Sequence, residues 1–368
     1  MHPGMTTVIS VAYILLFAYG VAPTLLWGDD AELQRIAVTG EARVVGQSSI
    51  ASHLLWQFVA STFVRWTTWL PVDQAGRVTL VSAIFAALAL VSVFLLCSVI
   101  ANRIGLHTRG AVVASAVGAM SLGLSHTFWL LASRPDAYTI QTFLLASALW
   151  AAVRASGSAS PWRWWLVVVG IVAVTLTNHA MVLASLPGLG VVAISGRIER
   201  RAVLVAGGLA IAIGVVVIGA AWEAGFPFGA LAATLTRYRP QLPRPLDPIA
   251  WLVFLAYQFP VAMVLVRWGA PRFFRSQRRL GAGLLLLFVG PVLLVLFPAL
   301  YIRDQYIFYL PSYLPVAVVI GLGAGWVVEN PPAWLRVRGP LLIGSLVAMA
   351  CAPVVVYPLA ATAPDASR

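Results

Sequence analysis

The stretch VTLVSAIFAALALVSVFLLCSVIA at residues 78–101 contains no charged side chain. An apolar run of about 20 residues is long enough to cross the hydrocarbon core of a bilayer as an α-helix. The run lacks the alternation of polar and apolar residues that a barrel strand shows, so it favours a helix. The whole chain resembles this stretch, because 61% of its 368 residues are hydrophobic and only 10% are charged, with a mean hydropathy of +0.91. The composition therefore predicts an all-α integral membrane protein.

Apolar windows of this kind recur along the chain, and we expect about eleven transmembrane helices. They lie near residues 7–27, 78–101, 110–131, 137–153, 164–178, 180–195, 202–221, 249–266, 280–298, 307–327 and 340–358. The first window has no basic segment before it and no clear cleavage site, which favours a retained helix over a signal peptide. The fifth and sixth windows are short for a bilayer of ~30 Å, so they are expected to be a tilted pair or a pair that does not cross completely.

The distribution of arginine predicts the orientation. All 24 basic residues are Arg. With a cytoplasmic N-terminus, the inner connections hold 14 Arg and 2 acids, whereas the outer segments hold 10 Arg and 10 acids. Inner connections of membrane proteins are enriched in positive charge, so we predict a multi-pass protein of the cell (inner or plasma) membrane with its N-terminus in the cytoplasm. The Arg residues are spread over short connections rather than one soluble face, which argues against a nucleic-acid partner. Cys97 and Cys351 fall inside apolar windows, so no disulfide framework or metal site is predicted.

The first outer segment, residues 28–77, is the longest connection. Polar side chains recur in it every four residues, at Ser49, His53, Gln57, Ser61 and Arg65. Such a stripe on an apolar helix is typical of a helix at the membrane surface or beside a wet cavity, so we expect amphipathic helices here. The other long outer segment, 222–248, contains prolines that exclude a continuous helix. We expect one transmembrane domain over residues 1–368 and no separate soluble domain.

Three carboxylates come together directly after the first window, at Asp29, Asp30 and Glu32. A structural interpretation is a capping box, in which Asp29 caps a helix and Glu32 returns the hydrogen bond. A functional interpretation is a general base, because a carboxylate within reach of a hydroxyl can accept its proton as that hydroxyl attacks. The two interpretations are compatible, since the start of a helix holds a side chain well.

Further polar clusters are predicted on the same outer face, at the ends of apolar windows. Their members are His53, Arg134, Asp136, Tyr138, His179, Arg303, Asp304 and Tyr306. Each cluster alone has a structural explanation, such as an interfacial ion pair, a hydrogen-bonded histidine or the aromatic belt of membrane proteins. Transporters and pumps usually carry ionisable groups near the midplane of the bilayer. The gathering of acids at one face therefore favours a site at the outer surface.

Five segments in order carry a resemblance: GDDAEL, SHLLW, HTFWLLASRPDAYT, TNHAMVLASLPG and RDQYIFYLPSYLPVA. They resemble a family of polytopic proteins that is similar to protein O-mannosyltransferases, within the GT-C superfamily of membrane glycosyltransferases. The resemblance covers residues 20–325 and rests on the order of the motifs. It implies transfer of a sugar, a hexose such as mannose, from a polyprenyl-phosphate carrier on the extracytoplasmic face, with inversion. Many relatives also carry a soluble C-terminal domain.

The resemblance also implies roles for particular residues. The family's first-loop GD-x-x-E falls on Gly28, Asp29 and Glu32, which implies that Asp29 is the catalytic base. The family's E-V-Y-T falls on residues 136–139, with Asp136 where Glu is usual. The H-P-P-G-Y motif falls near His53, without its prolines and glycine.

A polyprenyl-phosphate donor needs an apolar groove for its tail and Arg side chains near the interface for its phosphate. The outward candidates are Arg134, Arg237, Arg239 and Arg303. No cofactor is required, because Arg side chains can stabilise the charge of the departing phosphate. A divalent metal is nevertheless compatible with the site. The expected partners are the lipid-linked donor, a protein, lipid or glycan acceptor, and the bilayer. Two alternatives stay open, a flippase or transporter of lipid-linked sugars and a catalytically silent assembly subunit.

Overall fold

The computed structural model describes residues 3–22, 25–26, 29–41, 53–179, 181–196, 204, 208, 247–296, 305–332 and 339–362. Every regular element within these residues is a helix, which confirms the predicted all-α class. The first half contains α1 (Pro3–Tyr19), α2 (Asp29–Thr39), α3 (Leu54–Trp66), α4 (Gln74–Arg103), α5 (Thr108–Gly123), α6 (His126–Ala132), α7 (Tyr138–Ser156), α8 (Pro161–Asn178) and α9 (Val182–Ala193). The second half contains α12 (Asp247–Gln258), η2 (Ala262–Leu265), α13 (Val266–Ser276), α14 (Arg278–Leu296), η3 (Gln305–Tyr309), α15 (Leu310–Glu329) and α16 (Gly339–Thr362).

Several of these helices are long and apolar enough to cross a membrane. Among the described residues four qualify alone, or up to six if each of two bent helix pairs is one span. Ten of the predicted windows coincide with described helices, and the window 202–221 lies outside the described residues apart from Leu204 and Gly208. The count of eleven spans therefore stays a prediction.

Two of the predicted windows, 110–131 and 249–266, are formed by bent pairs of helices. The first bend, of 70°, separates α5 from α6, and the Ser125 hydroxyl donates to the Leu122 carbonyl at 2.7 Å there. The second bend, of 96°, separates α12 from residues 262–276 and contains Pro260. Proline removes a backbone donor and clashes with the preceding turn, which ends α12. Residues 267–276, expected as a loop, instead form most of α13.

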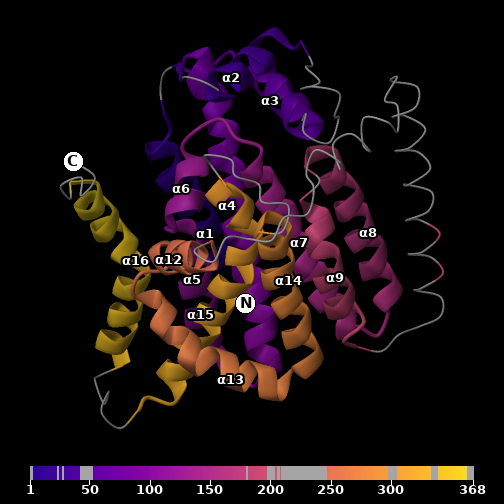
Figure 1. The fold of residues 1–368 in the computed structure, drawn as a ribbon, viewed down its shortest axis with the longest axis vertical. Helices are drawn as coiled ribbons and strands as arrows, with labels where there is room; N and C mark the ends of the chain where they lie inside the picture. Colours follow the sequence, from indigo (N-terminus) through magenta and orange to yellow (C-terminus); the bar gives the residue numbers. More distant parts are fainter. Residues whose placement is uncertain are drawn as a thin grey trace.

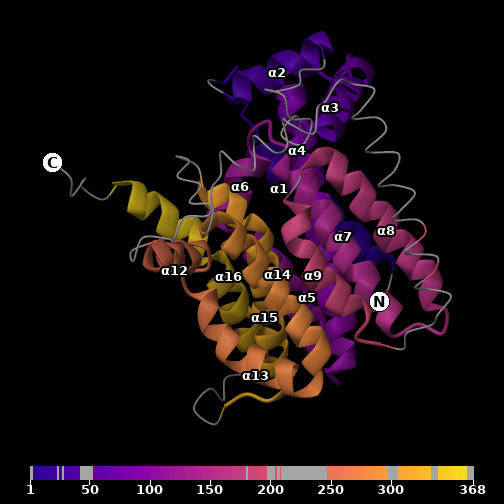
Figure 2. The ribbon, with the colours of Figure 1, turned by 45° about the vertical axis from the view of Figure 1, so that its right-hand side comes forward.

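The two ends of the bundle differ in Figure 1, where α2 and α3 cover one end and α13 lies at the other. We call these the cap end and the far end, and the turned view of Figure 2 keeps the same arrangement. The expected helices of the first outer segment are present as α2 and α3. Within the polar stripe of α3, Gln57 is buried and Arg65 is exposed, and Phe58 outside the stripe is 69% exposed. The cap thus places a polar side chain inward and an aromatic one outward.

The centre of the bundle is a close contact between α5 and α15. Small residues line it at four-residue spacing, Gly110, Ala114 and Gly118 on α5 and Gly321 and Gly325 on α15. A methyl group at Gly118 would lie 2.8 Å from the Cys97 sulfur and 3.1 Å from the Ala317 carbonyl oxygen. Small residues at this spacing let two membrane helices approach closely, which explains why α15 is almost completely buried.

Candidate active site at the cap end

Segments far apart in the sequence meet at the cap end of the bundle. The first link joins α2 to the turn between α6 and α7, where Arg134 Nη1 lies 3.4 Å from Asp30 Oδ2. The two side chains are 30% and 19% exposed, so the ion pair lies partly within the protein. The structure thus brings a predicted carboxylate and a predicted phosphate ligand into one place.

The turn between α6 and α7 is held rigidly by its neighbours. The Asp136 backbone N–H donates to the Ser82 hydroxyl at 2.9 Å, and this hydroxyl donates back to the Asp136 carbonyl at 3.2 Å. The Tyr138 N–H donates to Asp136 Oδ1 at 2.7 Å, and Asn178 Nδ2 donates to the Ala137 carbonyl at 2.9 Å. Helices α4 and α8 therefore fix the backbone of the turn, and the first residue of α7 fixes the direction of the Asp136 carboxyl.

Burial changes the acidity of Asp136, whose residue surface is only 8% exposed. Desolvation raises the pKa of this carboxyl to about 7, and the nearby Asp30 charge also raises it. The Tyr138 N–H and the Arg134 charge act in the opposite direction. Since burial penalises the charged form, Asp136 exchanges a proton near neutral pH.

Two histidines stack beside this turn, with the ring centroids of His53 and His179 separated by 5.1 Å and an interplanar angle of 18°. The Met181 N–H donates to His179 Nδ1 at 3.0 Å, so the neutral ring carries its proton on Nε2, 3.2 Å from the Tyr138 hydroxyl. His53 Nδ1 lies 2.9 Å from the Asn178 carbonyl oxygen, which accepts, so this ring carries its proton on Nδ1. The hydrogen bonds thereby select one tautomer of each ring.

Both rings are neutral at physiological pH. Burial lowers the pKa of His53, and burial together with the neighbouring His53 lowers the pKa of His179 to about 3. His53 stands directly before α3 with a φ of 49°, in the left-handed region that non-glycine residues rarely occupy. A backbone held in this region is often part of a functional site.

The segment before α15 reaches the same cluster through a residue that the sequence analysis did not single out. The Phe308 ring centroid lies 6.0 Å from that of Tyr138 and 6.3 Å from that of His179. Tyr306, in the same short helix η3, is half-buried. The remaining candidates of this group, namely Arg237, Arg239, Arg303 and Asp304, lie outside the described residues.

The three carboxylates of the first outer segment occupy the first turn of α2. Glu32 accepts two hydrogen bonds from Arg35, at 3.0 and 3.1 Å, and Asp30 faces Arg134. Asp29 is exposed, and no described residue forms an ion pair with it. Among the described residues, no three His, Cys, Asp or Glu side chains come close enough together to hold a metal ion.

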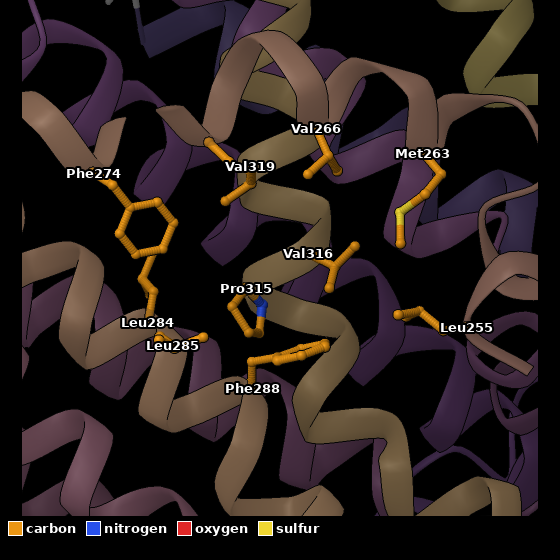
Figure 3. Close-up of a pocket in the computed structure, with 11 residues that line it drawn as sticks. Leu255, Met263, Val266, Phe274, Leu284, Leu285, Phe288, Pro315, Val316 and Val319 are labelled. Atoms are coloured by element: carbon orange, nitrogen blue, oxygen red, sulfur yellow. The ribbon is translucent and has the colours of Figure 1, made fainter. Parts of the chain in front are cut away.

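An apolar pocket of about 180 Å³ lies between α12, α13, α14 and α15. Figure 3 shows Phe274, Phe288, Pro315 and Val319 around it, and all of the described side chains that line it are apolar. Helix η3 leads directly into α15, so Phe308 at the cap-end cluster and Pro315 in the pocket wall are only about 10 Å apart along the chain axis. The polar cluster and the apolar pocket are therefore neighbours on one continuous segment.

Comparison with known families gives one match in sequence. Residues 53–202 match the model of the protein O-mannosyl-transferase TMEM260 N-terminal domain. The matched segment begins at His53 and includes Arg134, Asp136, Tyr138 and His179. A search of curated proteins found no match.

Solved structures share the fold at low sequence identity. ArnT from Cupriavidus metallidurans, bound to undecaprenyl phosphate, superposes with a TM-score of 0.59 at 18% identity, over 100% of this chain and 67% of that chain. The archaeal oligosaccharyltransferase AglB from Archaeoglobus fulgidus, in complex with an inhibitory peptide and a dolichol-phosphate, gives a TM-score of 0.57 at 11% identity, over 96% of this chain and 55% of that chain. The chain thus spans between about half and two thirds of the length of these proteins. The comparisons confirm the resemblance to GT-C membrane glycosyltransferases that the sequence motifs indicated.

Proposed function

We propose that this chain is a GT-C-type glycosyltransferase that moves a hexose, such as mannose, from a polyprenyl-phosphate carrier to a hydroxyl acceptor. The observation that carries the proposal is the meeting of Arg134, Asp30 and the buried Asp136 beside the exposed Asp29. Transfer from a phosphate carrier requires a cation for the departing phosphate and a base for the incoming hydroxyl. Both kinds of group occur together at the cap end.

Asp29 is the base in this proposal. Asp30 and Glu32 are engaged with Arg134 and Arg35, and pairing with a cation makes a carboxylate a weaker base. Asp29 carries no such pair among the described residues and is exposed, so an acceptor hydroxyl can approach it from outside. This assignment agrees with the first-loop motif of the resembling family.

Arg134 holds the donor phosphate. Its guanidinium presents several N–H donors in a fork that suits two phosphate oxygens. A donor phosphate would either share Arg134 with Asp30 or displace Asp30 from it. Donor binding is thereby coupled to the position of α2, which carries Asp30. Arg237, Arg239 and Arg303 are further phosphate ligands proposed from the sequence.

The carrier tail lies along the bundle, with part of it in the apolar pocket between α12, α13, α14 and α15. This pocket offers only apolar walls, which suit an isoprenoid chain. The first residue of α15 that lines the pocket, Pro315, follows Phe308 by seven residues. One lipid could therefore have its phosphate at the cap-end cluster and its tail in the pocket.

The reaction is a single displacement. The acceptor oxygen forms a bond to sugar C1, the bond from C1 to the phosphate oxygen breaks, and the phosphate departs with the electron pair. The acceptor proton passes to Asp29 and later to water. Attack opposite to the leaving group inverts the configuration at C1.

Tyr138 and the histidine pair position the sugar. Because His179 Nε2 donates to the Tyr138 oxygen, the Tyr138 hydroxyl hydrogen is left to donate to another group. His53 Nε2, unprotonated in its tautomer, is an acceptor. Neutral donors and acceptors of this kind suit sugar hydroxyls.

The decisive experiment uses the purified full chain in proteoliposomes with a radiolabelled polyprenyl-phosphate hexose and a crude acceptor extract. We expect the label to move to an acceptor that no longer carries the lipid. Movement of the intact labelled lipid between leaflets without transfer would instead identify a flippase. Absence of both activities, with the donor still bound, would identify a silent assembly subunit.

The site is proposed to face the outside, with the N-terminus in the cytoplasm. The test is labelling of single cysteines in a variant that lacks Cys97 and Cys351. A cysteine placed within residues 272–276 of α13 should react only with a reagent admitted from the cytoplasmic side. Reaction only from outside would overturn this orientation.

A further inference from the structure

The far end of the bundle contains a pocket of different composition, formed where α4, α7 and α8 meet. Its volume is about 520 Å³. Arg103, Arg154 and Trp164 line it, together with Asn102 and Ser158. None of the described residues that line this pocket is acidic.

Arg103 is held in place at the end of α7. Its Nη1 donates to the Ser156 hydroxyl at 2.6 Å, and its Nη2 donates to the Val153 carbonyl. A side chain at Gly157 would collide with this guanidinium, so the glycine makes room for it. Because a guanidinium has five N–H donors, further donors remain for a ligand in the pocket.

Arg154 approaches the same pocket from α7. Its guanidinium lies over the Trp164 ring, 5.3 Å from the centroid, and its side chain is otherwise exposed. The Arg103 and Arg154 charges repel each other. Two cations facing one pocket without an acidic lining residue are electrostatically complementary to an anion.

We infer that this pocket binds the phosphate of an anionic phospholipid. From Tyr138 at the cap-end site to Arg154 is about 24 Å along α7, close to the thickness of the hydrocarbon core. The pocket therefore lies at the opposite membrane surface, where phospholipid phosphates are found. Trp164 suits this level, since Trp is enriched at membrane interfaces.

Helix α8 offers a path for the acyl chains of that lipid. Val167 and Val174 are 42% and 43% exposed. They follow Trp164 by three and ten residues, which places all three on one face of the helix. A headgroup at Arg154 would thus leave its tails on an apolar surface. This site is separate from the proposed active site and does not depend on the proposed function.

The full chain is placed in phosphatidylcholine nanodiscs that contain increasing fractions of phosphatidylglycerol. The rise of its melting temperature with that fraction gives the apparent affinity for phosphatidylglycerol. Arg154→Gln should weaken the affinity about tenfold, because it removes charge-assisted hydrogen bonds to the lipid phosphate. The matched control is Arg163→Gln on α8, whose guanidinium also stacks on a tryptophan, 5.5 Å from the Trp162 centroid, but does not line the pocket. It should keep the wild-type affinity.

Other results would overturn the inference. Equal losses in Arg154→Gln and Arg163→Gln would show general surface attraction instead of a site. If inorganic phosphate without phosphatidylglycerol stabilises the wild type equally and requires Arg154, the ligand is a soluble anion. Should Arg154→Gln unfold, Arg154→Lys keeps the charge but loses the two-donor fork, and about a twofold weakening is expected. An unchanged affinity in Arg154→Lys would then contradict a phosphate held by the fork.

Discussion

The two ends of helix α7 present opposite chemistry. At its start, Asp136 and Tyr138 lie among carboxylates, neutral histidines and one partly buried arginine. At its end, Arg154 shares a pocket with Arg103, and no described lining residue is acidic. Helix α7 itself contributes Tyr138 to the first site and Arg154 to the second, and other segments supply the remaining groups at each end.

This difference shows how a proposed active site, at the cap end, can be distinguished from a proposed lipid-binding site, at the far end. At the cap end, Arg134 has a carboxylate partner and two tautomers are selected by hydrogen bonds, which are the features of a preorganised site. At the far end, no described acidic residue pairs with Arg103 or Arg154, so the proposed lipid phosphate would neutralise them. The following predictions test that contrast, from the largest expected effect to the smallest.

If chemistry is confined to the cap end, Asp29→Asn should reduce sugar transfer about 10²–10⁴-fold, because loss of a general base removes that much rate. The substitution keeps the shape and much of the ability to stabilise a helix start, so folding and donor binding should be nearly unchanged. The measurement is transfer of radiolabelled hexose per folded protein. The far-end control is Glu329→Gln, which makes the same change at a carboxylate 3.1 Å from His107 and should leave transfer intact.

The outcome also distinguishes neighbouring carboxylates. If Asp29→Asn keeps full turnover while Asp30→Asn abolishes it, the base is Asp30. If both variants stay active, the base lies elsewhere, and Asp136 is the next candidate. Loss of transfer in Glu329→Gln would break the contrast between the ends.

Arg134→Gln should weaken donor binding about 10- to 100-fold, because a hydrogen bond to a charged group is worth about 1.5–3 kcal/mol. Its effect on stability should be small, since a partly exposed ion pair contributes about 1 kcal/mol or less. Donor affinity is measured with a labelled polyprenyl-phosphate hexose, and thermal stability is followed in parallel. Arg109→Gln at the far end should change neither. Equal losses of affinity and stability would favour a purely structural role for Arg134.

Asp136 should make stability depend on pH. Its pKa is raised from 3.8 to about 7 on folding, so between these pH values the folded state binds more protons than the unfolded state. The free energy of unfolding therefore falls as the pH rises through this range. Between pH 5.5 and 7 the fall should be about 1.5 kcal/mol. The buried histidines contribute in the opposite direction, because their pKa values are lowered on folding.

The measurement is therefore the difference between wild type and Asp136→Asn in thermal stability as a function of pH. Asparagine keeps an oxygen for the Tyr138 N–H, and the histidines titrate in both proteins. The variant should gain stability relative to wild type as the pH rises. A constant difference would show that Asp136 is ionised throughout this range.

Tyr138→Phe should cost about 1 kcal/mol of stability, since it removes the hydroxyl that accepts from His179 Nε2 within the protein. The check is the melting temperature of the purified variant. Tyr19→Phe is the matched control, because Tyr19 is 92% exposed. An equal change in both variants would mean that the Tyr138 hydroxyl is not engaged in the folded protein.

Much of this contrast was predictable from the sequence. The apolar window at residues 78–101 specifies α4 without ambiguity, because membrane-spanning segments are helices or barrel strands and this one lacks the alternation of a strand. The gathering of Asp30, Arg134, Asp136 and His179 followed from their places at the ends of windows on one predicted face. The distribution of arginines also predicted that Arg103 and Arg154 lie on the opposite, inner face.

The features that the sequence did not predict depend on contacts between distant segments. Ser82 clamps the Asp136 turn from within an apolar window, where a serine normally bonds its own helix and gives no signal. The stacking of His53 on His179 joins residues more than a hundred positions apart. Pro260 did indicate the second bend, but the predicted window was based on hydropathy alone and did not use this proline. The helical form of α13 was missed because its many arginines resembled a connection.

The glycine contact between α5 and α15 has a consequence for how the chain is made. Gly118 and Gly321 are separated by about 200 residues, which take about 10–40 s to synthesise at the usual rates of translation. For that time the small-residue face of α5 is in the membrane without its final partner. Helix α5 must therefore remain unassembled, or rest against an earlier helix such as α4, until α15 is inserted. The innermost contact of the finished bundle is thus one of the last that the growing chain can form.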